Sequence, residues 1–301
     1  MTIERTEKIV VAGAGLMGRG IAHAFATSGY QTVLFDISDE ALSAAHGAIV
    51  SIVADGARLG KLSEEDADAA LGRLTTSTTI SDAAREGDLL VETVSESLAT
   101  KIAVVRAAEP LLAPDAIVAT NTSALSVTEI AAACRAPQRV AGMHFFNPVH
   151  KMRLIELVRG IATDDTTVAK LKGYADALGK SSIVVNESPG LTTSRMSALM
   201  GNEAMYMLME GTASAEDIDT ALRLGFNHPM GPLELGDLTG WDTRLSVLRY
   251  LHGALGEKFR PCPLIIKMVA AGRLGRKAGH GVYAYDNGQR VAGSGLRASA
   301  L

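Results

Sequence analysis

The sequence predicts an α/β protein: a Rossmann-type doubly wound sheet with a helical hairpin insertion, followed by an all-helical C-terminal domain. The first sign is a strand, a glycine-rich turn, a helix and a second strand in direct succession over residues 8–36. The second is a regular alternation of short apolar runs and helical patterns, which gives way near Val185 to helical patterns alone. We therefore expect a Rossmann domain, a helical domain and a flexible tail rich in Gly, Ala and Ser, with boundaries at 1–187, 188–286 and 287–301.

The glycine-rich turn is the first element of this pattern. A buried strand over residues 8–12 runs into a G-x-G-x-x-G motif, and an apolar helix follows it. In such a motif the first glycine permits the turn, the second lets backbone approach a pyrophosphate, and the third lets helix and strand pack closely. The N-terminus of the helix offers free N–H groups to the anion. We predict that the cofactor-binding residues here are Gly13, Gly15, Leu16, Met17 and Gly18.

Asp36 ends the second strand, about twenty residues after the glycines, where dinucleotide-binding proteins place an acidic residue. Its carboxylate suits a bidentate hydrogen bond to ribose hydroxyls and would repel a 2′-phosphate. NAD is therefore predicted in preference to NADP. The alternative is that the glycines only form a turn and that Asp36 only caps a helix.

The remaining elements follow from hydrophobic periodicity. Residues 39–73 are helical in pattern with breaks near Gly56 and Gly60, which predicts a helical hairpin and places Arg58, Lys61 and Arg73 near a surface. Further strands are expected at 88–94, 116–119, 139–143, 154–158 and 182–185, with helices around Lys101 and over 165–178. In the second domain we expect no strand, and helices at 192–210, 214–224, 232–255 and 263–271.

Length and composition limit the classes of protein. A chain of 301 residues favours two domains, and 47% hydrophobic with 21% charged residues is typical of a soluble globular protein. The N-terminus has no apolar leader and no apolar run could span a bilayer, so we expect a cytoplasmic location without membrane contact. Cys134 and Cys262 predict neither a disulfide nor a metal site. The net charge of −4 argues against nucleic acid, so an anionic ligand requires a local basic patch.

Oxidation of an alcohol at a dinucleotide site requires a group that accepts a proton, and histidine is suited to this role. His144 ends a buried strand at the edge where such sheets bind ligands, and Glu156 lies on the next strand. A carboxylate on the adjacent strand would orient the imidazole and stabilise its charged form. The periodicity alone leaves a structural role for His144 open, and His150 is the second candidate. No histidine pair has metal-type spacing with supporting acids, so we expect no metal.

Several runs of residues together carry a family resemblance. They are the glycine motif extended through Ala22, Asn121-Thr122-Ser123, His144-Phe145-Phe146-Asn147-Pro148, Ser188-Pro189-Gly190, His228-Pro229-Met230-Gly231-Pro232 and Leu274-Gly275-Arg276-Lys277. Because these motifs occur in this order, the chain resembles the L-3-hydroxyacyl-CoA dehydrogenase family, and in particular its bacterial 3-hydroxybutyryl-CoA dehydrogenase branch. The resemblance covers the whole chain except the tail.

The resemblance implies that the protein interconverts a short-chain (3S)-3-hydroxyacyl-CoA and the corresponding 3-oxoacyl-CoA with NAD as the cofactor. His144 would be the general base and Glu156 its partner, and Ser123 would hydrogen-bond the substrate oxygen or the cofactor. Further positions that match the family's cofactor pocket are Glu96, Lys101, Asn147 and Lys277. The basic hairpin, with Arg58 and Lys61, would lie near the CoA phosphates, and the helical domain would form a homodimer.

Two positions depart from the family, Ser97, where members often have asparagine after Glu96, and Ser194. Many members have an asparagine that assists at the substrate oxygen, where this chain has Ser194. A hydroxyl can still donate one hydrogen bond, and Asn202 on the same predicted helix either compensates or only packs between helices. Two other functions remain open: a dehydrogenase of a free 3-hydroxy acid such as a sugar acid or carnitine, and a non-catalytic NADH-binding protein.

Overall fold

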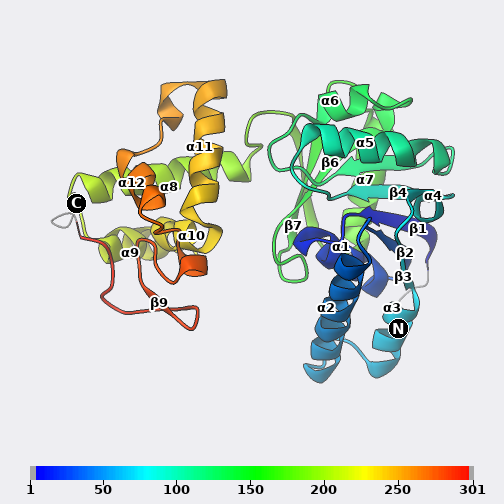
Figure 1. Ribbon diagram of the computed structural model, residues 1–301, viewed down its shortest axis with the longest axis horizontal. Coiled ribbons are helices and arrows are strands. Elements are labelled where there is room, and N and C mark those ends of the chain that lie inside the picture. The colour runs from blue at the N-terminus through cyan, green and yellow to red at the C-terminus, as the bar shows by residue number, and fades with distance from the viewer. Residues whose placement is uncertain (1–4, 298–301) are drawn as a thin grey trace. The chain divides into compact units, whose positions relative to one another are not determined.

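A computed structural model describes residues 5–297, which divide into two compact units between Glu187 and Ser188 (Figure 1). We refer to them as the N-terminal unit and the helical unit. No helix among the described residues is long and apolar enough to cross a membrane.

The N-terminal unit contains an eight-stranded sheet in the order β3-β2-β1-β4-β5-β6-β7-β8. Neighbouring strands are parallel except for the antiparallel pair β6 and β7. The strands are β1 (Arg5–Ala12), β2 (Tyr30–Phe35), β3 (Leu74–Ser77), β4 (Leu89–Glu92), β5 (Ile117–Thr120), β6 (Val140–Phe145), β7 (Leu154–Arg159) and β8 (Ser181–Asn186).

Helices cover both faces of this sheet, because its central strands are apolar on both sides. Ile9 and Val11 of β1 belong to one core cluster, while Val10 and Ala12 belong to the other, as the alternation of side chains along a strand requires. The first face is covered by α1 (Leu16–Thr27), α2 (Asp39–Arg58), α3 (Glu64–Gly72) and α7 (Asp165–Ala177). The second is covered by α4 (Ile80–Ala84), α5 (Leu98–Ala108) and α6 (Val127–Ala132). Two short 3-10 helices, Glu109–Leu111 and Pro137–Arg139, lie in the connections.

The position of the ligand-binding edge follows from the strand order. The chain order reverses between β1 and β4, and ligands of doubly wound sheets bind at the carboxyl ends of the strands at such a point. Gly13 follows β1 there, and Thr93 follows β4. The Thr93 hydroxyl donates to the carbonyl oxygens of Ala12 and Gly13 at 2.9 and 3.0 Å, which joins the two strand ends.

The helical unit has its own core around the buried Trp241. Its helices are α8 (Thr193–Met209), α9 (Ala215–Gly225), α10 (Pro232–Thr239), α11 (Trp241–Leu255) and α12 (Pro263–Ala270), with 3-10 turns at Glu257–Phe259 and Arg276–Ala278. Two buried carboxylates tie it together. Asp219 accepts from the hydroxyl of Tyr283 at 2.8 Å, and Asp237 accepts from the Trp241 indole at 2.6 Å and from the backbone N–H of Val282 at 2.8 Å.

Three expectations about elements differ from the structure. The predicted break near Gly56 is absent, because α2 runs unbroken from Asp39 to Arg58. The single helix expected over 232–255 is instead two helices, separated at Gly240, whose φ of 93° no helix accommodates. Arg73 is 8% exposed and donates to the Ala26 carbonyl oxygen, so it supports packing of the hairpin and is not a surface cation.

The C-terminal segment also differs from the loose tail that its composition predicts. Residues Tyr285–Asp286 (β9) and Gln289–Arg290 (β10) form a small antiparallel hairpin, so the second domain is helical with one short β-element. Beyond the hairpin, the N–H of Gly295 donates to Glu216 at 2.8 Å, and that of Leu296 donates to the Val282 carbonyl oxygen. These backbone groups anchor the segment, while residues 298–301 lie outside the described chain.

Candidate active site

The glycine turn leaves room where a cofactor phosphate would lie. Gly13 has a φ of 108°, which favours glycine, and a Cβ at Gly18 would overlap the Gly13 carbonyl oxygen, so helix α1 packs directly on the turn. A Cβ at Gly15, in contrast, would meet no atom within 4 Å. The middle glycine therefore borders open space, as expected where backbone approaches a ligand.

The N-terminus of α1 adds unsatisfied donors to this space. Gly15 is the N-cap and makes no side-chain capping hydrogen bond, and the first turn contains no acidic residue. The first N–H groups of a helix have no partner within it, so those of Leu16 and Met17 are available to an anion. An extended pyrophosphate fits both the space and the donors.

Asp36 lies beside the turn at the end of β2. Its Oδ2 accepts from the Ala14 N–H at 2.8 Å and its Oδ1 from the Ser38 N–H at 3.1 Å. The cap of α2 is Ser38, whose hydroxyl accepts from the Ala41 N–H, so Asp36 does not cap that helix. Each carboxylate oxygen has two lone pairs, so one on each is left for a ribose hydroxyl.

Glu96 organises the polar turn that follows β5. One of its carboxylate oxygens accepts from the Thr122 hydroxyl at 2.5 Å and from the Ser123 N–H at 3.0 Å. These hydrogen bonds hold the pKa of Glu96 below its usual range against the effect of burial, with help from the nearby Lys101. The hydroxyl of Ser123 lies 3.4 Å from the same oxygen. Ser123 is exposed, so it faces solvent at the ligand-binding edge.

Lys101 lies beneath this turn and is 1% exposed. Its ammonium contacts Glu92 at 3.0 Å, Glu96 at 3.2 Å and the Val94 carbonyl oxygen at 3.3 Å. The sequence-based prediction placed Lys101 in the wall of the cofactor pocket. In the structure its charge is directed to two glutamates, so it positions Glu96 and the end of β4. Its place in the cofactor pocket stays a prediction.

His144 and Glu156 form the pair that the sequence suggested. They are directly opposite each other in the antiparallel ladder of β6 and β7, and His144 Nδ1 lies 2.7 Å from Glu156 Oε2. Glu156 is fully buried and the His144 side chain is 9% exposed. The carboxylate fixes the ring and its tautomer with Nδ1 protonated, which leaves Nε2 as the basic nitrogen.

Hydrogen bonds link the carboxyl ends of four neighbouring strands into one edge. Thr93 joins β4 to the glycine turn after β1, Glu96 joins the end of β4 to Ser123 after β5, and Asn121 accepts from the Phe145 N–H of β6 at 2.8 Å. Adjacent strands lie about 4.8 Å apart, so three intervals place His144 about 14 Å from the glycine turn. An extended dinucleotide spans such a distance.

The other predicted site residues lie on different elements and are not joined to this edge by the hydrogen bonds described above. Asn147 is exposed, and Arg58 pairs with Asp55 at 2.9 Å on the hairpin surface. Ser194 and Lys277 belong to the helical unit, where Ser194 lies half-buried in the first turn of α8 and Lys277 pairs with Asp242 at 2.7 Å.

Asn202 performs a structural task in the helical unit. Its amide donates to the Arg260 carbonyl oxygen at 2.9 Å and accepts from the Cys262 N–H at 2.8 Å. Both functional groups of the side chain are therefore engaged in packing the segment before α12. Of the two roles considered for Asn202, this geometry agrees with packing.

Sequence reasoning missed Glu92 as the group that holds Lys101. Glu92 is fully buried, and it also accepts from the Thr120 hydroxyl at 2.6 Å and from the Val94 N–H at 2.7 Å. The available signal was a charged residue that ends a strand of otherwise apolar residues, nine positions before a lysine. Among the described residues no group of three or more His, Cys, Asp or Glu side chains could hold a metal ion.

A doubly wound sheet with this glycine turn, a carboxylate after β2 and an oriented histidine at the same edge is typical of nicotinamide-dependent dehydrogenases. Comparison with known proteins narrows the class. Residues 8–188 match the model of the 3-hydroxyacyl-CoA dehydrogenase NAD binding domain, and residues 190–285 match that of the 3-hydroxyacyl-CoA dehydrogenase C-terminal domain. The chain belongs to the 3-hydroxyacyl-CoA dehydrogenase family, as the sequence motifs indicated.

Individual relatives are similar along nearly their whole length. A probable 3-hydroxybutyryl-CoA dehydrogenase of Bacillus subtilis is 42% identical over 93% of this chain and 98% of its own. A 3-hydroxybutyryl-CoA dehydrogenase of Bradyrhizobium diazoefficiens is 43% identical over 95% and 97%. The crystal structure of (S)-3-hydroxybutyryl-CoA dehydrogenase from Ralstonia eutropha has a TM-score of 0.89 and 41% identity, covering 93% of this chain and 99% of that one.

Proposed function

We propose that this chain catalyses the reversible NAD-dependent interconversion of a short-chain (3S)-3-hydroxyacyl-CoA and the 3-oxoacyl-CoA. The observation that carries the proposal is the His144–Glu156 pair, held at 2.7 Å on the same sheet edge as the glycine turn. The names of the relatives support the substrate class, because several are 3-hydroxybutyryl-CoA dehydrogenases.

The proposed roles of the residues follow from their positions. Bound NAD would supply a hydride acceptor at its nicotinamide ring. His144 Nε2 would take the proton of the 3-hydroxyl as hydride leaves the carbon, and the buried Glu156 would stabilise the resulting imidazolium. In the reverse direction the imidazolium would return the proton to the 3-oxo group. Ser123 would donate its hydroxyl to the same oxygen or to the cofactor, and Ser194 is a further candidate for the substrate oxygen.

Consumption of NADH in the presence of acetoacetyl-CoA tests this function directly. We expect turnover with acetoacetyl-CoA and much less with acetoacetate, because the second is the substrate expected of a free 3-hydroxy acid dehydrogenase. Faster turnover of acetoacetate would favour that alternative, and no consumption with either would favour a non-catalytic NADH-binding protein.

The cofactor preference gives a prediction about Asp36. In the double variant Asp36→Ser, Ile37→Arg, a carboxylate that repels a 2′-phosphate is removed and a guanidinium is added beside it. Ile37 is 86% exposed, so an arginine fits there. We expect the ratio of kcat/KM for NADP to that for NAD to rise at least about tenfold, since a charge-assisted hydrogen bond contributes about 1.5–3 kcal/mol. The single variant Ile37→Arg separates the two changes. Equal use of NADP by the unaltered enzyme would contradict the role of Asp36.

A homodimer formed by the helical unit is part of the proposal. Large apolar side chains remain exposed there: Leu224 by 77% and Phe226 by 73%. We expect the unaltered protein to sediment as a dimer. In Phe226→Asp the equilibrium should shift towards the monomer, because a charge replaces an exposed apolar side chain. Sedimentation of the unaltered protein as a monomer at micromolar concentration would exclude the dimer.

A cytoplasmic location is also proposed, supported by two free cysteines, Cys134 and Cys262.

A further inference from the structure

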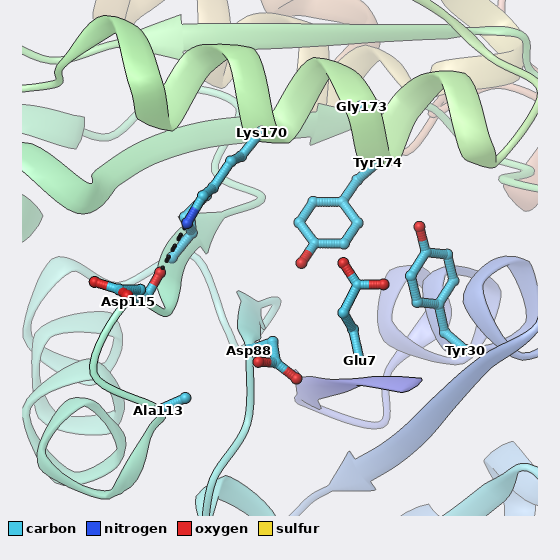
Figure 2. A pocket seen from close by; sticks show the side chains of 9 residues that line it. Glu7, Tyr30, Asp88, Ala113, Asp115, Lys170, Gly173 and Tyr174 are labelled. Carbon is cyan, nitrogen blue, oxygen red and sulfur yellow. Dashed lines mark hydrogen bonds between the residues drawn. The ribbon is translucent and has the colours of Figure 1, made fainter. Parts of the chain in front are cut away.

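A cavity of about 390 Å³ lies in the N-terminal unit at the amino ends of the sheet strands, the edge opposite the glycine turn (Figure 2). It is lined by residues of β1, β2, β5 and α7 and by the residue that precedes β4. No residue of the proposed active site contributes to it. We call it the amino-edge cavity; its polar and charged lining residues are Glu7, Tyr30, Asp88, Asp115, Lys170 and Tyr174.

The lining of the amino-edge cavity is acidic. Among the described residues it contains three carboxylates and one ammonium group, which leaves two negative charges uncompensated. The Lys170 ammonium donates at 3.4 Å to the backbone carbonyl oxygen of Asp115. Within residues 5–297 no ion pair joins Lys170 to a carboxylate, and the Glu7 carboxylate has no hydrogen-bond or ion-pair partner. A concave site with this excess of negative charge attracts a cation.

The side chain of Tyr174 gives an independent sign of a ligand. It is only 8% exposed, and its ring packs against those of Phe25 and Tyr30 at centroid distances of 6.1 and 5.7 Å. Its hydroxyl, in contrast, points into the cavity towards Glu7 (Figure 2), and it makes no hydrogen bond to another described residue. A hydroxyl that is withdrawn from bulk water without a partner is unfavourable. A bound donor would satisfy it.

The electrostatics around Tyr174 agree with a negative potential in the cavity. Burial, the charges of Glu7 and Asp88 and the neighbouring Tyr30 raise the pKa of Tyr174. The phenol therefore stays neutral at neutral pH, and its oxygen is available as a hydrogen-bond acceptor. Glu7 and Asp88 are the carboxylates that act on this hydroxyl, so the three groups face the same part of the cavity.

The acceptors of this part of the cavity match the donors of a primary ammonium group. An ammonium has three N–H donors and no acceptor. Glu7 and Tyr174 have unused acceptor oxygens, and Asp88 keeps Oδ1 free because its Oδ2 accepts from the Lys8 N–H at 2.8 Å. A metal ion fits less well, since the described residues include no group of three or more His, Cys, Asp or Glu side chains that could hold one.

We infer that the amino-edge cavity binds the primary ammonium group of a small aliphatic amine, through hydrogen bonds to Glu7, Asp88 and Tyr174. The two uncompensated negative charges of the lining favour a diamine or polyamine over an amino acid, whose carboxylate would add negative charge. A ligand that binds only the folded chain stabilises it, so the amine should also raise the melting temperature. The site is separate from the proposed catalytic edge, and the inference does not depend on the proposed function.

The test is a calorimetric titration with 1,4-diaminobutane of the unaltered protein and of two conservative variants. Glu7→Gln removes one charge and keeps the shape of the side chain, and Kd should rise at least about tenfold, as for the loss of a hydrogen bond between charged groups. Tyr174→Phe removes only the hydroxyl and keeps the ring, and Kd should rise about two- to tenfold. The matched control is Asp68→Asn, which neutralises an exposed carboxylate of α3 outside the cavity and should leave Kd unchanged.

Two further probes separate the possible sources of the cation. The probe 4-aminobutanoate has the same ammonium group with a carboxylate, and tetramethylammonium has a positive charge but no N–H donor. Tighter binding of 1,4-diaminobutane than of 4-aminobutanoate would identify a polyamine, and the reverse order would identify an amino acid bound by the same ammonium site. Tetramethylammonium should bind more weakly than both, because it cannot donate to Glu7, Asp88 or Tyr174.

Three results would overturn the inference: no saturable binding of either amine at millimolar concentration, equal binding of tetramethylammonium, or the same Kd in Glu7→Gln and the unaltered protein. Melting temperatures without amine show whether each variant is folded. With 1,4-diaminobutane, the melting temperature should rise more in the unaltered protein and in Asp68→Asn than in Glu7→Gln. An equal rise in all three proteins would mean that the amine acts elsewhere on the surface.

Discussion

Replacing His144 with alanine should lower kcat for reduction of acetoacetyl-CoA by about 10²–10⁴-fold, the usual contribution of a general acid–base group. The imidazole is held by Glu156 at 2.7 Å and its Nε2 has no hydrogen-bond partner among the described residues, so this nitrogen is free to accept the substrate proton. NADH binding should change little, because the glycine turn and Asp36 lie at the ends of other strands. Stopped-flow kinetics and fluorescence titration with NADH measure the two effects separately.

His46→Gln is the matched control, since His46 is an exposed histidine of α2. It should retain the activity of the unaltered enzyme. Glu156→Gln should give a smaller loss than His144→Ala, because its amide keeps the ring in place but cannot stabilise an imidazolium. A loss of less than about tenfold for His144→Ala would reject the general-base role, given the range above. Loss of NADH binding alone would assign His144 to structure.

The parts of the site that depend on local backbone geometry were predictable from the sequence. The glycine turn requires particular residue types at fixed positions, so its motif is recognisable without any tertiary contact. The His144–Glu156 pair was predictable because two short apolar runs joined by a short loop pair side by side. Their exact register, which places the two residues opposite each other, follows from the antiparallel ladder of β6 and β7.

Other features depend on contacts between distant residues and were not predictable. The strand β3, Leu-Thr-Thr-Ser, is an edge strand with two exposed residues, so it lacks the apolar run that identifies a central strand. The burial of Lys101 and its pairing with Glu92 were not predictable, because a lysine in a helix gives no sign that it is buried.

The buried lysine leads to the second large expected effect. Replacing Lys101 with methionine keeps the length of the side chain but leaves Glu92 fully buried without its cation. Breaking a buried ion pair by removing one partner costs about 3–5 kcal/mol, so we expect the free energy of unfolding to fall by about that amount. Chemical denaturation monitored by circular dichroism measures it. Release of Glu96 from the same ammonium should also loosen the Ser123 turn and raise the KM for NADH.

The free energy of unfolding of Lys101→Met should depend on pH, and the direction of that dependence follows from the pKa of Glu92. Burial raises the pKa of Glu92, and Lys101 and hydrogen bonds from Thr120 and Val94 oppose that effect. Without Lys101, the pKa of Glu92 in the folded variant rises further above its value in the unfolded chain. The folded variant then holds a proton that the unfolded chain releases, so its free energy of unfolding is greatest below the ordinary pKa of glutamate and falls as pH rises towards the folded value. The unaltered protein should show a weaker fall.

A double variant distinguishes the unpaired charge from lost packing. In Lys101→Met, Glu92→Gln the buried charge is gone, and the amide oxygen can still accept from the Val94 N–H while the Thr120 hydroxyl turns to accept from the amide. We expect this variant to recover at least half of the stability lost by Lys101→Met and to lose the steep pH dependence, since the two residues are in direct contact and their effects are not additive. Equal destabilisation of the single and double variants, with the same pH profile, would mean that Lys101 acts through packing and that Glu92 does not need its charge.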